Sequence, residues 1–290
     1  MDIDDIAELA RRIFPPSTSD SVGKHGPPGG VVLLRYPRTT SFQSAIYEPV
    51  FCLIVEGSKQ TRVGGETRTV RPGEGLLVSH DLPVVSRVVR APYLALILSL
   101  DLELLRSLRD DVDDSAPEPY TARVLELHRP DAALIDALGR YLALTASPRD
   151  RDVLGPLVVR EIHYRLLRAP VGAMLRRMLW KGSSESAVAR AIARIRRDFR
   201  TPLSIPELAQ ESGMSAAAFH KHFKAVTHSS PLQYQKELRL LDARRLLAEG
   251  ATHVSSVAFD VGYESPSQFS REYARRFGVP PSRDIVAPPS

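Results

Sequence analysis

The segment from Val31 to Ser99 alternates short apolar runs with polar turns. Most runs are rich in valine, isoleucine, leucine or aromatic residues, which is typical of β-strands. Turn residues separate them, for example at Gly64-Gly65 and Pro72-Gly73. Because no helical pattern interrupts the runs, we expect six to eight short strands in an antiparallel barrel or jelly roll. The runs are VVLLRY, VFCLIV, KQTRV, TRTV, GLLVS, VVSRVV and YLALILSL.

After residue 100 the pattern changes to apolar positions three and four residues apart, which indicates helices. Three such segments follow, DLELLRSL, DAALIDALGRYLALT and VLGPLVVREIHYRLLR. The stretch WKGSSE, which begins at Trp180, has the composition of a linker. We therefore expect a first domain over 1–180, with the barrel at about 31–100 and helices at about 101–180, a linker over 181–186 and a second domain over 187–290.

The second domain contains one motif twice, and each copy has the layout of a helix-turn-helix. A short helix carries a small residue where a second helix approaches, a glycine supplies the positive φ of the turn, and a serine caps the second helix. Two copies predict two DNA-reading units. The matched positions are Leu208, Ala209, Gly213, Ser215, Phe219, Phe223 and Pro231 in the first copy and Val257, Ala258, Gly262, Ser265, Phe269, Tyr273 and Pro281 in the second.

Capping signals predict the limits of the helices in these units. Ser204–Glu207 and Ser265–Gln268 have the spacing of capping boxes, in which the two side chains bond each other's backbone N–H. The second helix of each unit, which reads the DNA, should cover about 216–226 and 266–276. The aromatic residues four positions apart within these helices should face the core.

Between the two units, Pro231–Ala248 is predicted to be one long helix that spaces them. Two reading helices held in this way should enter successive major grooves, roughly 34 Å apart. Leucines of the long helix should face inward and arginines outward. The inward set is Leu232, Leu238, Leu241, Leu246 and Leu247, and the outward set is Arg239, Arg244 and Arg245.

Residues between the core aromatic positions face outward and can enter a major groove. Arg271 is the favoured base contact because arginine can bond guanine O6 and N7 together, with a phosphate contact as the alternative. Ala217 can meet a thymine methyl group but cannot hydrogen-bond a base. The candidate DNA-binding residues are Ala217, His220, Lys221 and Lys224 in the first unit and Ser267, Gln268, Arg271 and Arg275 in the second.

Charge is distributed unevenly. Residues 176–290 hold 18 Lys and Arg against 11 Asp and Glu, a net charge of +7, and residues 1–175 hold 21 against 23, a net charge of −2. A basic second domain fits binding to a polyanion such as double-stranded DNA. Cys52 is the one cysteine, and the acidic, amphipathic N-terminus differs from a signal peptide. We therefore expect a cytoplasmic protein without a membrane segment.

The second domain resembles a known family. SPLQYQKELRLLDARRLL (230–247) and DVGYESPSQFSREYARRFGVPP (260–281) are similar to the DNA-binding domain of the AraC/XylS transcription regulators. The resemblance implies RNA polymerase as a partner. At His253 the family often has an aspartate N-cap, so the helix that follows should begin less firmly. The resemblance places Ala217, His220, Lys221, Pro266, Ser267, Gln268 and Arg271 at the family's base-reading positions.

The first domain resembles the cupin-like sensor domain of one branch of this family. The similar segments are LLRYPRTT (33–40), YEPVFCLIVEGSK (47–59), GEGLLVSHDLPV (73–84) and YLALILSLDLELL (93–105). This resemblance implies an unknown small-molecule effector and a helical segment that forms a homodimer. The expected fold is therefore α+β, an antiparallel cupin-like β-barrel with a helical dimerisation segment followed by an all-α double helix-turn-helix domain.

A cupin barrel can also carry a metal enzyme, and metal-binding cupins have two histidines separated by one residue on a strand. The barrel segment has His80 alone, with His25 just before it, and His80-Asp81 is more simply a pair that bonds locally at a loop end. His220 and His222 lie on different faces of a helix. We expect no metal, no cofactor and no enzyme activity. A cupin-type enzyme with a DNA-binding tail, and a DNA-binding dimer without a ligand, stay as alternatives.

The strand Val50–Val55 is apolar on both faces, so one face should pack against helices and the other should line the barrel interior. We expect a small apolar cavity there, with Val50, Cys52 and Ile54 as candidate effector-binding residues. Apolar neighbours favour a buried, unreactive Cys52 over a sensing thiol, which needs exposure and a nearby cation.

The last helix of the first domain has a broad apolar stripe, which either covers the barrel or forms a homodimer. The stripe is Leu154, Leu157, Val158, Ile162, Leu166 and Leu167.

Overall fold

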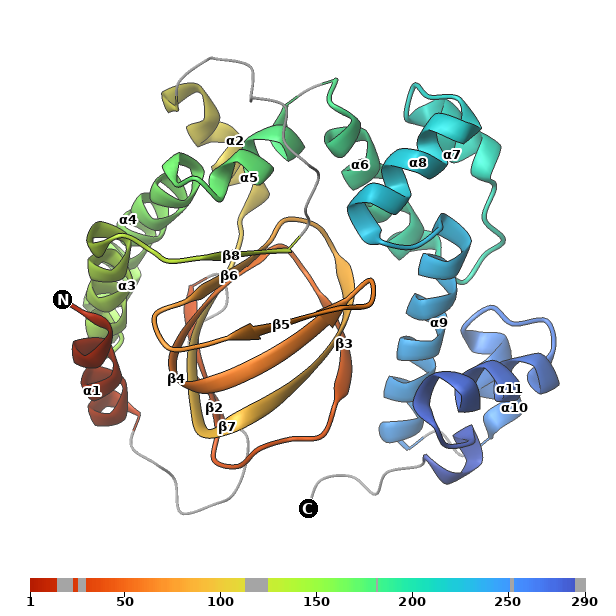
Figure 1. Cartoon of the computed structure of the whole chain (residues 1–290), viewed down its shortest axis with the longest axis horizontal. Coiled ribbons are helices and arrows are strands. Elements are labelled where there is room, and N and C mark those ends of the chain that lie inside the picture. Colours follow the sequence, from red (N-terminus) through yellow and green to blue (C-terminus); the bar gives the residue numbers. More distant parts are fainter. Residues whose placement is uncertain (15–22, 26–29, 113–124, 181, 251–252, 285–290) are drawn as a thin grey trace. The chain divides into compact units, whose positions relative to one another are not determined.

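The computed structural model describes residues 1–14, 23–25, 30–112, 125–180, 182–250 and 253–284. The chain divides into two compact units, Met1–Ser186 and Ala187–Ser290. The first unit is a curled antiparallel sheet with helices, here called the sheet domain, and the second is all-helical (Figure 1). This is the predicted α+β fold class.

Over the described residues the sheet has eight strands, in the order β1-β2-β7-β4-β6-β8, with β3 paired to β7 and β5 paired to β4. All pairs are antiparallel. The sheet curls around an interior lined by one face of its central strands (Figure 1). The strands are β1 Gly23–His25, β2 Val31–Tyr36, β3 Gln43–Tyr47, β4 Val50–Val63, β5 Glu66–Val70, β6 Gly75–Val78, β7 Leu82–Ser99 and β8 Leu125–His128.

Two central strands are longer than predicted. The runs VFCLIV and KQTRV are both parts of β4, and VVSRVV and YLALILSL are both parts of β7. The two strands pair with each other along most of their length, through register shifts between Ile54 and Lys59. Gly57 within this irregular stretch has φ +74°, so the chain bends and the strand continues. Strand β8 was also missed, because it follows the first helix after the predicted barrel segment.

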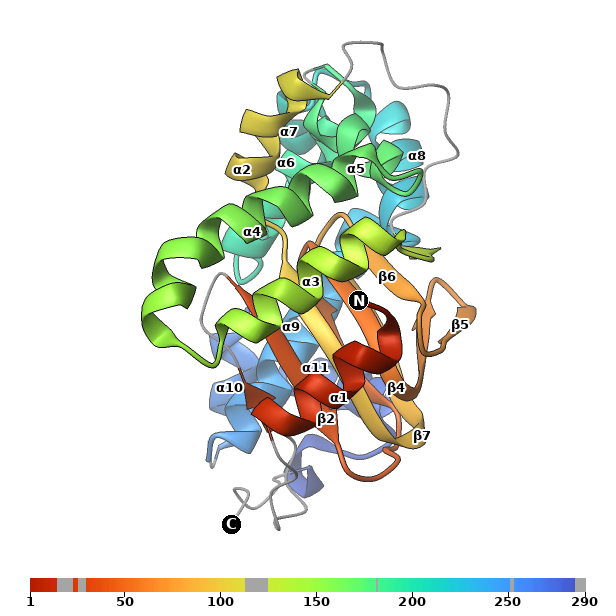
Figure 2. The same cartoon turned by 90° about the vertical axis from the view of Figure 1, so that its left-hand side faces the viewer.

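Helices cover the outside of the sheet. Figure 2 shows α1, α3 and α4 side by side over one face, and α1 and α3 contact strands β4 and β2. Helix α4 begins at Pro148, five residues before the predicted start at Val153, because Ser147 caps it and proline fits the first turn. The helices of this unit are α1 Ile3–Ile13, α2 Leu102–Leu108, α3 Ala132–Leu144, α4 Pro148–Arg168 and α5 Gly172–Leu179, with a 3₁₀ turn η1 at Arg109–Asp111.

The second unit contains the predicted helices of the two helix-turn-helix units and the long helix between them, and also α6, which was not predicted. Residues 184–186 of the expected linker 181–186 belong to helix α6, and Lys181 lies outside the described residues. The two reading helices, α8 and α11, extend one residue beyond the predicted 216–226 and 266–276. The helices are α6 Ser184–Asp198, α7 Ile205–Glu211, α8 Ala216–Thr227, α9 Pro231–Ala248, α10 Val254–Asp260 and α11 Pro266–Phe277, with a 3₁₀ turn η2 at Pro281–Arg283.

The capping boxes are only half formed. Ser204 Oγ accepts from the backbone N–H of Glu207 (3.4 Å), and Ser265 Oγ accepts from that of Gln268 (3.3 Å). The Gln268 side chain donates to Glu272 Oε1 (3.3 Å) instead of bonding back to the cap. His253 makes no side-chain capping bond to α10, as the resemblance implied.

Two predictions for α9 were wrong. Leu232, expected inward, is 52% exposed, whereas Tyr234 and Ala243 are fully buried. Arg239, expected outward, donates to three backbone carbonyls, those of Phe199 (2.7 Å), Gly262 (2.7 Å) and Thr201 (3.0 Å). The helical period places Arg239 near the core, and its long side chain reaches carbonyl groups that end other segments. It therefore ties the long helix to the segment between α6 and α7 and to the turn of the second helix-turn-helix unit.

Candidate nucleic-acid interface and ligand cavity

Each reading helix buries its aromatic residues and exposes its candidate DNA-binding residues. Phe219 and Phe223 of α8 and Phe269 and Tyr273 of α11 are fully buried. Gly213 and Gly262 form the turns before these helices, with φ of +66° and +91°. The eight candidates all lie on exposed faces: Ala217, His220, Lys221 and Lys224 on α8, and Ser267, Gln268, Arg271 and Arg275 on α11.

The basic residues of this unit fall into two groups. Arg276 pairs with Glu237, and Arg244 Nε lies 2.9 Å from Asp284 Oδ2, so these arginines bind acidic groups of the protein itself. In the described part of the chain no such ion pair occupies Arg271 or Arg275. These two guanidinium groups are therefore available to an anionic partner.

Gln268 is held by its neighbour Glu272. Glu272 also accepts from Lys236 Nζ (2.9 Å) and from the Tyr263 hydroxyl (2.8 Å). Burial raises the pKa of Glu272, and the bonds from Lys236, Tyr263 and Gln268 lower it by more, so the carboxylate stays ionised. This network fixes the side chain of Gln268 at the start of α11.

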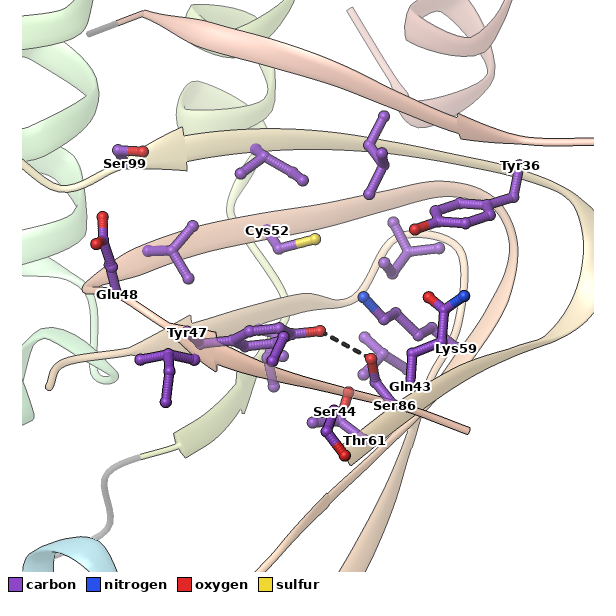
Figure 3. A pocket seen from close by; sticks show the side chains of 18 residues that line it. Tyr36, Gln43, Ser44, Tyr47, Glu48, Cys52, Lys59, Thr61, Ser86 and Ser99 are labelled. Atoms are coloured by element: carbon purple, nitrogen blue, oxygen red, sulfur yellow. Dashed lines mark hydrogen bonds between the residues drawn. The ribbon is translucent and has the colours of Figure 1, made fainter. Parts of the chain in front are cut away.

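A cavity of about 390 Å³ lies within the curled sheet. Val50, Cys52 and Ile54 line it, and Figure 3 shows the Cys52 sulfur pointing into it. Its size is that of a small-molecule site. Further apolar lining comes from Leu34, Val70, Leu76 and Ile97, and polar lining from Tyr36, Gln43, Tyr47, Lys59, Thr61 and Ser86.

The polar lining residues Lys59 and Thr61 were missed by the sequence prediction. Side chains of a strand alternate between faces, so Ile54 and Lys59, five positions apart, should point to opposite faces. The register shifts between Ile54 and Lys59 change this alternation, and both residues line the cavity. Gly57, in the EGSK stretch, could have indicated this irregularity from the sequence, because a glycine inside a strand often marks a bulge.

Lys59 lies among tyrosine hydroxyl groups and the Cys52 thiol. Its Nζ is 5.2 Å from the centre of the Tyr47 ring, and the Tyr47 hydroxyl donates to Ser86 Oγ (3.2 Å; Figure 3). Burial lowers the pKa of Lys59, and Tyr47, Cys52 and Tyr36 raise it by more. The ammonium group is therefore protonated at neutral pH.

Cys52 is half-buried rather than fully buried, because its side chain faces the cavity. Burial raises the pKa of its thiol, and the nearby Lys59 and Tyr93 lower it by less. A cation therefore lies close to Cys52, which its apolar sequence neighbours did not predict. Even so, the thiol is protonated at neutral pH, and a protonated thiol is a poor nucleophile.

His80 is buried and bonds differently from the prediction. Its Nδ1 lies 2.7 Å from Ser79 Oγ and its Nε2 lies 3.3 Å from the Glu185 carbonyl oxygen, so its local partner is Ser79 and not Asp81. Burial lowers the pKa of His80 to about 4, against smaller opposing effects of Glu185. Over the described ranges, no group of three or more His, Cys, Asp and Glu side chains is arranged to hold a metal ion.

The apolar stripe of α4 has two parts. Val158, Ile162, Leu166 and Leu167 are buried, whereas Leu154 and Leu157 are 43% and 64% exposed. Val153 beside them is also exposed. The buried part packs within the sheet domain, and the other part forms an exposed apolar patch.

None of the helices in the described part of the chain is long and apolar enough to cross a membrane.

Comparison with known proteins identifies similar sequences for both units. A family model described as the N-terminus of AraC-type transcriptional regulators matches residues 28–174, and a helix-turn-helix domain model matches residues 208–284. The regulator CdhR of Pseudomonas aeruginosa is 31% identical over 156 residues, which cover 54% of this chain and 43% of CdhR. ExsA of the same organism is 26% identical over 238 residues, which cover 80% of this chain and 84% of ExsA.

The fold is shared with solved structures of ToxT from Vibrio cholerae. An apo variant superposes with a TM-score of 0.56 at 12% identity, covering 88% of this chain and 97% of that one. Wild-type ToxT with a bound unsaturated fatty acid superposes with a TM-score of 0.51 at 14% identity, covering 94% of this chain and all of that one.

Proposed function

Because this chain belongs to the AraC-type transcriptional regulators, we propose that it controls transcription by inserting α8 and α11 into two successive major grooves of DNA. The observation that carries this proposal is the pair of matching helices, each with a buried aromatic face and an exposed polar face. Helix α9, with 18 residues, is the rigid spacer between them. Arg239 supports this role because it ties α9 to the Thr201 carbonyl, in the segment before the first helix-turn-helix unit, and to the Gly262 carbonyl in the turn of the second.

Contacts to DNA divide into two kinds in this proposal. Arg271 and Gln268 read base edges, since their side chains match the hydrogen-bonding groups of guanine and adenine. Ala217, His220, Lys221 and Ser267 complete the base-facing set, and Lys224 and Arg275 bind phosphates. Gln268 is suited to its role because Glu272 already fixes its amide nitrogen.

Binding of the full-length chain to duplex DNA at a series of salt concentrations tests this function. Several phosphate contacts should make log K fall with log salt at a slope of about −0.9 per contact. Selection from a random DNA pool should then yield sites with two half-motifs about one helical turn apart. A flat salt response, or a pool without enrichment, would contradict the proposal.

The cavity of the sheet domain is proposed as the effector site. Its volume is in the range of small-molecule sites, and its wall combines apolar side chains with a cluster of polar groups at one end. ToxT, which shares the fold, has been solved with an unsaturated fatty acid, so a small ligand has a precedent within this fold.

The remaining partners follow from the same function. We propose a homodimer formed through the exposed part of α4, which would place two sets of reading helices on adjacent DNA sites. A regulator of this kind acts with RNA polymerase in the cytoplasm. The similar proteins are regulators, which favours this role over the alternative of an enzyme with a DNA-binding tail.

A further inference from the structure

One charged side chain faces the cavity of the sheet domain without a counterion. Among the described residues that line this cavity, Lys59 is the one basic residue, and no carboxylate of the described chain forms an ion pair with it. Its neighbours are the phenol groups of Tyr36 and Tyr47 and the thiol of Cys52, and none of them is a carboxylate. Lys59 is half-buried, and a charge that is partly removed from water is costly unless it is paired. A ligand that brings a negative charge would therefore be stabilised here.

A second polar group at the same end of the cavity lacks a partner. Thr61 is 1% exposed, and its hydroxyl has no hydrogen-bond partner within the described structure. It follows Lys59 by two positions on β4, so both side chains lie on one face. Figure 3 shows them near the hydroxyl groups of Tyr47 and Ser86. Because buried polar groups are normally satisfied, this pair indicates a ligand with an acceptor oxygen.

The rest of the cavity suits an apolar body. Val50 and Ile54 of β4, with Leu34 and Ile97 of the neighbouring strands, provide aliphatic walls next to the polar end. The Glu48 carboxylate lies at the opposite end from Lys59 (Figure 3) and has an interaction of its own. Its charge repels an anionic group, so it would direct such a group toward Lys59.

We propose that this cavity binds a small organic acid, whose carboxylate pairs with Lys59 and accepts from Thr61 and whose apolar body lies against Val50 and Ile54. The inference rests on the proposed effector site and defines the chemical class of its ligand. A carboxylate fits better than a phosphate ester, because one lysine matches one negative charge. Formation of an imine between Lys59 and an aldehyde ligand is disfavoured, since the protonated ammonium group is not a nucleophile.

Calorimetric titration of the full-length protein tests this inference. The probes are hexanoate, octanoate, decanoate and 4-phenylbutyrate, each compared with its neutral primary amide. At least one acid should bind, and its amide should bind at least about tenfold more weakly, because the amide cannot pair with the lysine. Equal affinity for acid and amide, or no binding of any acid up to millimolar concentration, would overturn the inference.

Three variants locate the contact. Lys59→Met keeps the length of the side chain and should weaken the acid at least about tenfold while changing amide binding less than twofold. Thr61→Val should weaken the acid by several-fold. Arg12→Met, at an exposed position of α1, is the matched control and should leave acid binding unchanged. Acid binding that survives Lys59→Met overturns the assignment.

A result that contradicts carboxylate binding can be distinguished from a result that contradicts the proposed function. DNA binding of the same preparations, measured with and without the acid, reports on the regulator separately. Urea unfolding followed by circular dichroism shows that each variant is folded. Amides that bind as well as acids would leave the cavity as an effector site and remove only the carboxylate class. A wild-type protein that binds no DNA, with or without the acid, would contradict the proposed function instead.

Discussion

Gly57 lies so close to Pro92 that a Cβ atom at position 57 would stand 2.5 Å from the Pro92 carbonyl oxygen. The Arg90 carbonyl oxygen is also in the way, and φ at Gly57 is +74°. A side chain therefore meets both backbone strain and a steric clash at this position. The close approach holds β4 against β7 where the pairing shifts register, and this shift brings Lys59 and Thr61 into the cavity.

We expect Gly57→Ala to destabilise the protein by more than about 2 kcal/mol, from strain and clash together. Gly65→Ala is the matched control, because Gly65 has φ +90° but no atom within 4 Å of its Cβ position. It should cost about 1–2 kcal/mol, from strain alone. Urea unfolding followed by circular dichroism measures both. Equal decreases in unfolding free energy for the two variants would show that the contact between Gly57 and β7 has no energetic role.

The same glycine explains which part of the cavity could be predicted from sequence. Alternation along Val50–Val55 predicted one inward face, and Val50, Cys52 and Ile54 do line the cavity. Alternation fails beyond Ile54, because the number of residues in a bulge is set by pairing with a distant strand. Lys59 and Thr61 were therefore missed. Pairing between β4 and β7 also explains why the predicted short runs form longer strands.

The helical unit was predicted more closely because its signals are local. Serine caps, turn glycines and aromatic residues four positions apart fix the limits and the buried face of a helix within a dozen residues. Arg239 is the exception. Its partners, the carbonyls of Phe199, Thr201 and Gly262, come from distant parts of the chain. Periodicity alone cannot show that such carbonyls converge on one side chain.

Arg271 and Lys224 should differ in their effect on DNA binding. Arg271→Ala should cost about 1–3 kcal/mol on the preferred site and little on random DNA, because it removes a base contact. Lys224→Ala should weaken all sequences about equally and reduce the salt slope by about one. Titrations on both kinds of DNA separate the roles. If Arg271→Ala lowered the affinity for both kinds of DNA equally, Arg271 would be a phosphate contact.

Acidification should destabilise the sheet domain through His80. The pKa of His80 is about 4 in the folded protein, and its ordinary value is 6.5, so between these pH values only the unfolded chain binds the proton. Stability is therefore full above about pH 6.5 and falls by about 3 kcal/mol as the pH drops through this window to 4.

The variant His80→Gln removes the titrating group. The difference in unfolding free energy between wild type and His80→Gln should shrink steadily from pH 7 to pH 4. The exposed His253 supplies the control, and His253→Gln should keep the pH profile of the wild type. A difference that is constant across the range would show that His80 does not take up a proton on unfolding.

The exposed patch on α4 provides the test of dimerisation. Leu157 is 64% exposed and lies beside Val153 and Leu154, so three large apolar side chains face solvent on one protomer. A single Leu157→Glu substitution places a charge in this patch at little cost to the monomer, because the side chain is not part of the core. Sedimentation of the full-length protein at tens of micromolar should therefore show a dimer for the wild type and a monomer for the variant. Leu232→Glu, at an exposed position of α9, is the control and should stay dimeric. A wild-type monomer, or a dimer that survives Leu157→Glu, would contradict an interface at this patch.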